Sequence, residues 1–243
     1  GGAGFPTGVK LSPKNADEID TIIINGCECE PYLTVDYRIM LEKGEQIVKA
    51  VRQIQRLLPN AKAIFGIEDN KSDSIKVIKG FIQPDDNMDI CELKTKYPQG
   101  GERSLIYAVT GRKINSKMLP ADAKCVVVNS STCFAIYNAL YENIPLIYRY
   151  MTITGDGVNQ CNNFKVPIGC SHQYVIEKCG GLKEDVVKVI SGGPMTGFAM
   201  STLEVPVQKT SASILAFTED DVASVEATNC IHCGRCVSVC PSN

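Results

Sequence analysis

Four closely spaced cysteines near the end of the chain are the residues best suited to carry chemistry. They read Cys230-x2-Cys233-x2-Cys236-x3-Cys240, and Pro241 follows the last of them. In bacterial ferredoxins with this spacing, the first three thiolates bind one [4Fe-4S] cluster and the fourth ligates a second cluster. Zinc sites more often divide into two separated cysteine pairs, and disulfides are the other alternative. The spacing therefore favours these four cysteines as metal ligands of an iron–sulfur cluster.

The start of the chain is rich in glycine and reads Gly1-Gly2-Ala3-Gly4-Phe5-Pro6-Thr7-Gly8-Val9-Lys10. A backbone without side chains can come close to a phosphate or to a planar ring, and Lys10 can neutralise anionic oxygens. The alternative is a flexible tail, so this segment needs support from the rest of the chain.

Three polar or glycine-rich turns follow predicted strands, at residues 25–31, 97–103 and 129–132. Parallel α/β sheets bind their ligands beyond the carboxyl ends of the strands, where these turns are expected to lie. Glu28 and Glu30 in the first turn suit hydrogen bonds from ribose hydroxyls, and the glycine pair in the second suits an anion at a helix start. The alternative for the first turn is an ordinary solvated turn.

Buried strands alternate with amphipathic helices over residues 20–141. Strands are predicted at residues 20–25, 61–67, 88–94 and 124–129. Helices are predicted at residues 34–58 and 71–81, and two more end at residues 110 and 141. This alternation predicts an α/β fold with a doubly wound, mostly parallel sheet.

The pattern changes after Pro145. Short strands are predicted at residues 149–154, 164–168, 186–191 and 213–217, around one helix at residues 172–179. Such an arrangement predicts a small β-grasp domain. We therefore predict three domains, at residues 1–145, 146–217 and 218–243, the last being the start of a truncated ferredoxin-type cluster domain.

Composition narrows the class of protein. The 243 residues carry a net charge near −2, which gives no sign of a nucleic-acid partner. No run of eighteen apolar residues occurs, so no transmembrane segment is predicted in this chain. Twelve cysteines are many for a cytosolic protein, and those outside the terminal run are interpreted as reduced thiols. Cys27 and Cys29 are either packed side chains or, less favoured, a redox dithiol.

Several of these motifs together resemble those of a known family. Gly1–Lys10 is similar to the flavin loop of the NADH-binding flavoprotein subunit of respiratory complex I, and residues 25–31 resemble its acidic turn. Together with Gly192-Gly-Pro-Met-Thr-Gly197 and the cysteine run, the chain resembles the RnfC family, which forms a peripheral subunit of Rnf-type electron-transport complexes. The related PrdC family, associated with proline reductase, is nearly as similar. The resemblance covers essentially the whole chain, in order.

The resemblance implies FMN bound between the glycine loop and the strand ends, NADH stacked over the flavin, and a small domain of the ubiquitin-like SLBB type. It assigns the flavin to Gly1, Gly2, Gly4, Lys10, Asn25, Glu28, Gly101, Glu102, Asn129 and Ser130. It places Phe5 and Glu30 against the nicotinamide nucleotide.

Three residues depart from the complex I pattern. Cys27 replaces an aspartate, Arg103 replaces an acid, and Ser130 replaces a second asparagine. These departures are what a chain with a decayed flavin site would show, so a relay that uses only its clusters stays open as an alternative function.

The function that the resemblance implies is electron transfer. NADH gives up two electrons as hydride and a cluster accepts one, so a flavin is needed between them. We expect an NADH-dependent oxidoreductase subunit that passes electrons between NADH, FMN and [4Fe-4S] clusters. Its expected partners are the membrane subunits of an Rnf-type complex or, in the PrdC-like alternative, a soluble reductase. The expected location is the cytoplasm or the inner face of the cell membrane.

Overall fold

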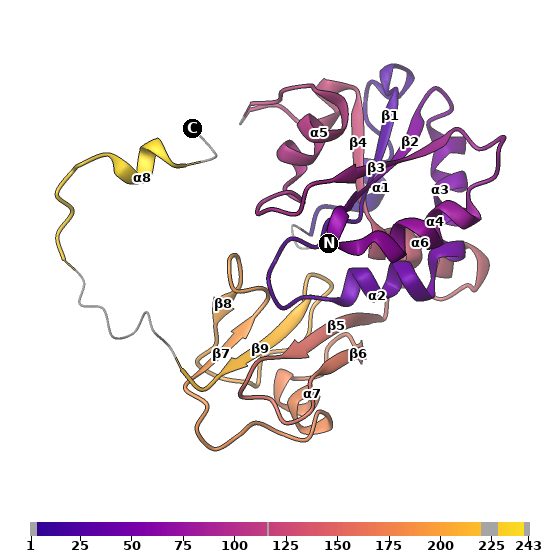
Figure 1. Ribbon diagram of the computed structural model, residues 1–243. Coiled ribbons are helices and arrows are strands. Elements are labelled where there is room, and N and C mark those ends of the chain that lie inside the picture. The colour runs from indigo at the N-terminus through magenta and orange to yellow at the C-terminus, as the bar shows by residue number, and fades with distance from the viewer. Residues whose placement is uncertain (1–3, 116, 220–227, 241–243) are drawn as a thin grey trace.

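A four-stranded parallel sheet organises the larger lobe of the computed structural model, which describes residues 4–115, 117–219 and 228–240 (Figure 1). Its strands are β1 Thr21–Asn25, β2 Lys62–Glu68, β3 Met88–Leu93 and β4 Cys125–Asn129, in the order β3-β2-β1-β4. Both faces of the inner strand β1 are buried, which explains why its isoleucines form an unbroken apolar run.

Helices cover both faces of this sheet. The elements are α1 Thr7–Lys10, α2 Val35–Glu42, α3 Gly44–Leu57, α4 Ser72–Phe81, α5 Glu102–Thr110 and α6 Ser130–Tyr141, with short 3-10 turns at Ala16–Glu18, Asp69–Lys71 and Pro120–Ala123. Ile22 and Ile24 face the core shared with α2, α3, α4 and α6, and Ile23 faces the opposite core beside α5. The predicted doubly wound sheet is confirmed, because alternate side chains of β1 bury against helices on opposite faces.

The long helix predicted at residues 34–58 is wrong in one respect, because the structure divides it into α2 and α3 at Lys43. A Cβ atom at Gly44 would come within 2.9 Å of Val77 Cγ1 in α4. The glycine thus lets α3 begin in close contact with α4. The apolar periodicity continues across the break, so the sequence pattern does not reveal it. The glycine-rich segment also holds one unpredicted helical turn, α1.

The smaller lobe is a mixed five-stranded sheet packed against one helix. Its strands run in the order β6-β5-β9-β7-β8. They are β5 Tyr148–Thr154, β6 Asn162–Pro167, β7 Lys188–Ser191, β8 Phe198–Ala199 and β9 Ser213–Phe217, and the helix is α7 His172–Lys178. β5 and β9 pair in parallel at the centre. This is the predicted β-grasp arrangement, with the two-residue strand β8 as an unpredicted addition.

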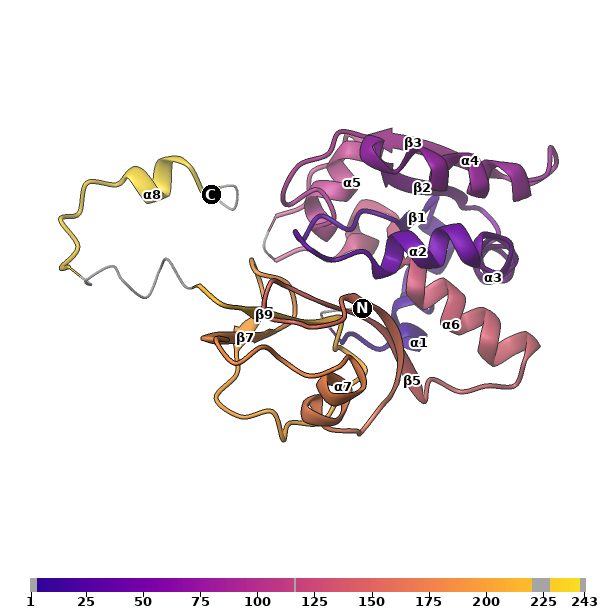
Figure 2. The same cartoon turned by 60° about the horizontal axis from the view of Figure 1, so that its bottom comes forward.

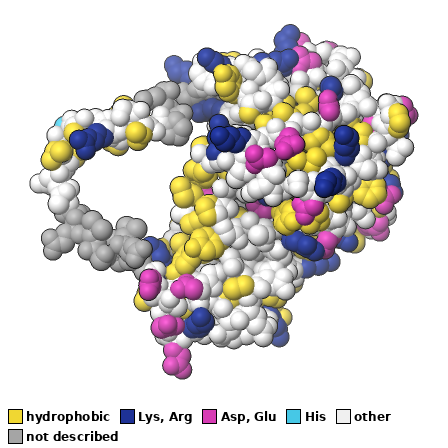
Figure 3. All heavy atoms as spheres, in the orientation of Figure 1, with side chains coloured by type: hydrophobic (Ala, Val, Ile, Leu, Met, Phe, Trp, Pro, Cys, Tyr) yellow, Lys and Arg dark blue, Asp and Glu magenta, His cyan; other side chains and the backbone are white. Residues whose placement is uncertain are grey.

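The two lobes contact each other along α2, α6 and β5 (Figure 2). The Thr34 backbone N–H donates to Thr152 Oγ1 at 3.1 Å, and Asn138 Nδ2 donates to the Tyr148 hydroxyl at 3.0 Å. Acidic and basic side chains alternate over the face drawn in Figure 3, where exposed apolar side chains gather between the lobes and beside the small sheet. Within the described ranges, no helix is long and apolar enough to span a bilayer.

Gly155 allows a test of the backbone packing within the smaller lobe. Its φ is +111°, and an added Cβ would overlap the carbonyl oxygen of Ala216 in β9. We expect Gly155→Ala to lower the free energy of unfolding by about 2–3 kcal/mol, because both strain and overlap act on the backbone. Chemical denaturation measures the change. Gly80→Ala is the matched control, since its Cβ meets open space in α4, and we expect it to stabilise by about 0.5–1 kcal/mol. Equal effects would contradict this account.

Candidate functional site

Turns that follow β1, β3 and β4 meet at one edge of the parallel sheet. Asn25 lies at the end of β1, and its Nδ2 donates to the Gly100 carbonyl at 2.9 Å. Its Oδ1 accepts from the Cys27 N–H at 3.0 Å. A Cβ atom at Gly100 would lie 2.6 Å from the Cys27 carbonyl oxygen, so only glycine permits this approach. The turn after β3 is thereby fixed against the turn after β1.

The glycine-rich segment reaches the same edge. Lys10, in α1, forms an ion pair of 2.9 Å with Glu102, the first residue of α5. Phe5 is 51% exposed, and its ring centroid lies 5.9 Å from Lys10 Nζ. The structure thus brings together Lys10, Glu102 and Asn25 from separate parts of the chain, whereas Gly1 and Gly2 lie outside the described residues.

Glu28 stabilises a helix rather than facing open space. Its two carboxylate oxygens accept the backbone N–H groups of Asp36 and Tyr37, at 2.9 and 3.1 Å, in the first turn of α2. Burial, with a further contribution from the Asp36 charge, raises the pKa of Glu28 to about 8, although both backbone hydrogen bonds oppose the shift. Sequence reasoning did not find this capping role, because Glu28 lies seven residues before α2 begins.

Asn129 and Ser130 lie where β4 passes into α6. Asn129 Oδ1 caps the helix by accepting from the N–H groups of Ser131 and Thr132, as the Asn-Ser-Ser-Thr pattern predicts. Its Nδ2 donates to Asp36 Oδ2 at 2.7 Å, and Ser131 Oγ donates to the other oxygen of Asp36. The start of α6 is therefore bound to the start of α2 through one carboxylate.

Glu30 is held by the smaller lobe. Its carboxylate accepts from the Met195 N–H at 2.9 Å and from the hydroxyl of Thr196. Gly193 packs so closely on this carboxylate that a Cβ there would overlap it. The loop at residues 192–197 therefore lies against the acidic turn, an arrangement that the sequence suggested only through the resemblance.

A buried pair of opposite charges supports the turn after β2. Glu68 is fully buried and Lys71 is 7% exposed, with 2.9 Å between Lys71 Nζ and Glu68 Oε2. Burial, and then the Glu68 charge, raise the pKa of the Cys27 thiol to about 12, and burial also raises the pKa of Cys29. Both thiols therefore stay protonated at neutral pH, which favours packing over redox chemistry for this pair. All twelve cysteines are free.

The residues at this edge fit a flavin with a phosphate tail. The Oγ of Ser130 and the Oε1 of Gln99 are buried without a hydrogen-bond partner in the part of the chain that the structure describes, so a bound group could satisfy them. Glycine at positions 100 and 101 keeps the backbone of the adjoining turn free of side chains. Lys10 and the start of α6 supply positive charge for anionic oxygens.

The cysteine segment lies apart from this edge in both ribbon views (Figures 1 and 2). It holds one helical turn, α8 Arg235–Ser238, and the side chains of Cys230, Cys233, Cys236 and Cys240 are all exposed. Among the described residues, no three cysteine, histidine or acidic side chains are grouped as metal ligands. The four thiols have the donor chemistry that an iron–sulfur cluster requires, and their role as its ligands stays a prediction.

Comparison with protein families assigns the chain to a class. Residues 1–138 match the model of the Nuo51 FMN-binding domain, and the chain belongs to this family. Residues 150–199 match the SLBB domain, and residues 222–243 match a 4Fe-4S binding domain. The predicted combination of FMN-binding, SLBB and 4Fe-4S domains is therefore confirmed.

The chain is also similar to subunits of ferredoxin:NAD(+) oxidoreductase complexes. The chain is 47% identical over 241 residues to a subunit of the proton-translocating ferredoxin:NAD(+) oxidoreductase complex of Clostridium ljungdahlii, covering 99% of this chain and 52% of the relative. It is 42% identical to the corresponding subunit of the Na(+)-translocating ferredoxin:NAD(+) oxidoreductase complex of Acetobacterium woodii, covering 99% and 54%. The predicted resemblance to the RnfC family is confirmed, and the chain spans about half the length of these relatives.

A solved structure shares the fold. The chain superposes on a chain of an NAD+-reducing [NiFe]-hydrogenase in the air-oxidised state with a TM-score of 0.76 and 19% sequence identity. The match covers 89% of this chain and 43% of the hydrogenase chain. At this identity the likeness supports the architecture of the two lobes.

Glu28 should make stability depend on pH. Its pKa is raised in the folded state, so the folded protein binds the extra proton, and stability falls as pH rises from about 4.5 toward 8. We expect Glu28→Gln to remove this dependence. The unfolding free energy of Glu28→Gln minus that of the wild type should rise between pH 5 and pH 8.5. We expect a rise of more than about 1.4 kcal/mol, the equivalent of one pKa unit. Urea denaturation across this range measures it, and parallel pH profiles would refute the assignment.

Proposed function

We propose that this chain passes electrons between NADH, FMN and [4Fe-4S] clusters as a peripheral subunit of an Rnf-type complex. The observation that carries the proposal is the Lys10–Glu102 ion pair, which places the glycine-rich segment at the carboxyl edge of the sheet. The relatives named as subunits of ferredoxin:NAD(+) oxidoreductase complexes support this role over that of an electron donor to proline reductase. Membrane subunits are then its partners, at the cytoplasmic face.

Different residues of the site have different roles in binding the cofactor. When bound, FMN converts the two-electron chemistry of NADH into single-electron transfer. Gly4, Lys10 and Glu102 would hold the flavin, and Asn25 with Gly101 would shape the adjoining turn. We propose the same binding role for Gly1, Gly2, Asn129 and Ser130.

Three further residues have narrower roles in the proposal. Glu28 acts through the backbone of α2, because both of its oxygens are occupied there. Phe5, which is half exposed, offers a ring on which a nicotinamide can stack. Glu30 holds the 192–197 loop beside the place proposed for the nucleotide.

The activity is tested by anaerobic reconstitution with iron, sulfide and FMN, followed by titration with NADH. We expect the flavin absorption band to bleach and the cluster to be reduced in turn. Cys233→Ser should lose one [4Fe-4S] equivalent of iron and sulfide while the flavin still bleaches, because a cube needs its thiolate ligands. Cys161→Ser, at an exposed cysteine of the smaller lobe, is the control. A flavin that NADH leaves unbleached would favour the cluster-only relay instead.

Lys10 should contribute to flavin affinity. We expect Lys10→Met to weaken FMN binding about tenfold, because a charge-assisted contact to the ligand is lost and Glu102 is left without its partner. Flavin fluorescence titration measures the affinity. Lys14→Met, at an exposed lysine, is the matched control. Equal affinities for the two variants would remove Lys10 from the site.

A further inference from the structure

Arg149 is a buried cation that lies outside the part of the chain matched by the flavin-binding family. It stands on β5 and is only 8% exposed. Its Nε donates to the Ser211 carbonyl at 3.2 Å, and no carboxylate of the described residues lies within ion-pair distance of it. Burial lowers the pKa of Arg149. A buried guanidinium without an ion pair destabilises the folded state, which suggests that it binds an anion.

Asp36 is the acid whose charge acts on Arg149, and it opposes the effect of burial. Its carboxylate is already used, however. Oδ2 accepts from Asn129 Nδ2 and Oδ1 accepts from Ser131 Oγ, so both oxygens serve the start of α6. The Nη groups of Arg149 therefore remain available for another anion.

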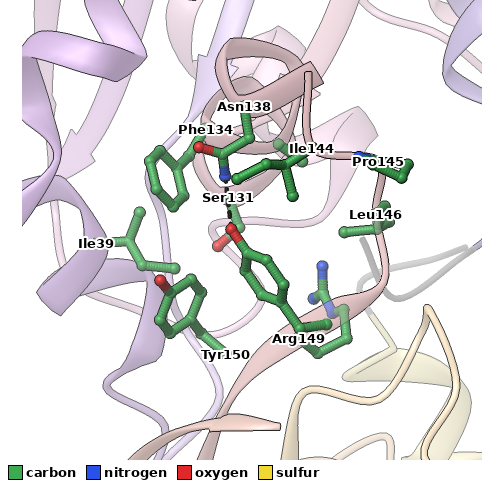
Figure 4. A pocket seen from close by; sticks show the side chains of 11 residues that line it. Ile39, Ser131, Phe134, Asn138, Ile144, Pro145, Leu146, Arg149 and Tyr150 are labelled. Atoms are coloured by element: carbon green, nitrogen blue, oxygen red, sulfur yellow. Dashed lines mark hydrogen bonds between the residues drawn. The ribbon is translucent and has the colours of Figure 1, made fainter. Parts of the chain in front are cut away.

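Arg149 opens onto a small cavity beside α6. The polar side chains in its lining are those of Ser131, Asn138, Tyr148, Arg149 and Tyr150, and its volume is about 20 Å³. Figure 4 shows Arg149 extending from β5 toward Leu146. A space of this size accepts a water-sized group, such as one oxygen of a larger anion, and excludes a flavin ring.

The surroundings of Arg149 connect it to the glycine-rich segment. Ser211, which accepts from Arg149, follows Thr210, whose Cγ2 lies 3.0 Å from the Cβ position of Gly4. Ser131 belongs to the first turn of α6, a helix of 12 residues whose positive end favours an anion. Lys10, in the glycine-rich segment, is paired with Glu102.

We infer that Arg149 binds a phosphate group where β5, the first turn of α6 and the glycine-rich segment meet. A phosphate monoester carries close to two negative charges at neutral pH, and a guanidinium can bind two of its oxygens at once. The phosphate of FMN is one source of this group, in which case the inference rests on the proposed function, and free phosphate is the other. Arg149 then makes the site selective for the phosphorylated form of the flavin.

The test compares FMN, riboflavin and inorganic phosphate as ligands. We expect Arg149→Met to weaken FMN binding about tenfold or more and to change riboflavin binding less than twofold, since riboflavin lacks the phosphate. Arg149→Lys should restore part of the FMN affinity. Arg38→Met, which removes an exposed arginine paired with Glu42, is the control and should change neither affinity. Fluorescence titration measures both flavins, and phosphorus NMR measures inorganic phosphate.

The outcomes separate this inference from the proposed function. If Arg149→Met weakens FMN and riboflavin equally, or neither, Arg149 does not bind the flavin phosphate. Loss of inorganic phosphate binding alone would identify free phosphate as the ligand. If the unmodified chain binds neither flavin, the proposed function fails, and inorganic phosphate binding still decides the role of Arg149. Phosphate bound equally by the wild type and by Arg149→Met would overturn the inference.

Discussion

The in-register pairing of β1 with β2 and β4 is the constraint on which the site depends. Asn25 stands opposite Gly66 on one side and Asn129 on the other, so β1 and β4 end at the same level and β2 continues beyond them to Glu68. A slip of one residue would exchange the two faces of β1 and move Asn25 away from the turn that it binds. The precision of the site thus comes from the burial of ordinary isoleucine and valine side chains.

Most of the acids at this edge are committed to partners within the protein. Glu28 caps α2, Asp36 joins two helix starts, Glu30 binds the smaller lobe, and Glu68 pairs with Lys71. Because these carboxylates are already hydrogen-bonded or ion-paired within the protein, an anionic ligand can bind near them. Backbone N–H groups, a glycine surface and a few cations are what remain for recognition.

The sequence predicted the elements better than it predicted their contacts. Strand ends, the cap at Asn129 and the glycine turns follow from local patterns, so the edge of the sheet could be located in advance. No local pattern showed that Glu28 binds the backbone of α2. Arg149 gave no signal, because its burial depends on packing between two lobes that are separate in the sequence.

The close fit of Gly193 on Glu30 limits how the lobes can be recombined. A chimaera that takes the smaller lobe from another protein would bring a different loop to this carboxylate, and a side chain at position 193 would push the lobes apart. Exchange between relatives therefore has to carry the acidic turn and the 192–197 loop together. The two lobes are separate folds, but at this joint the sequence of each one constrains the other.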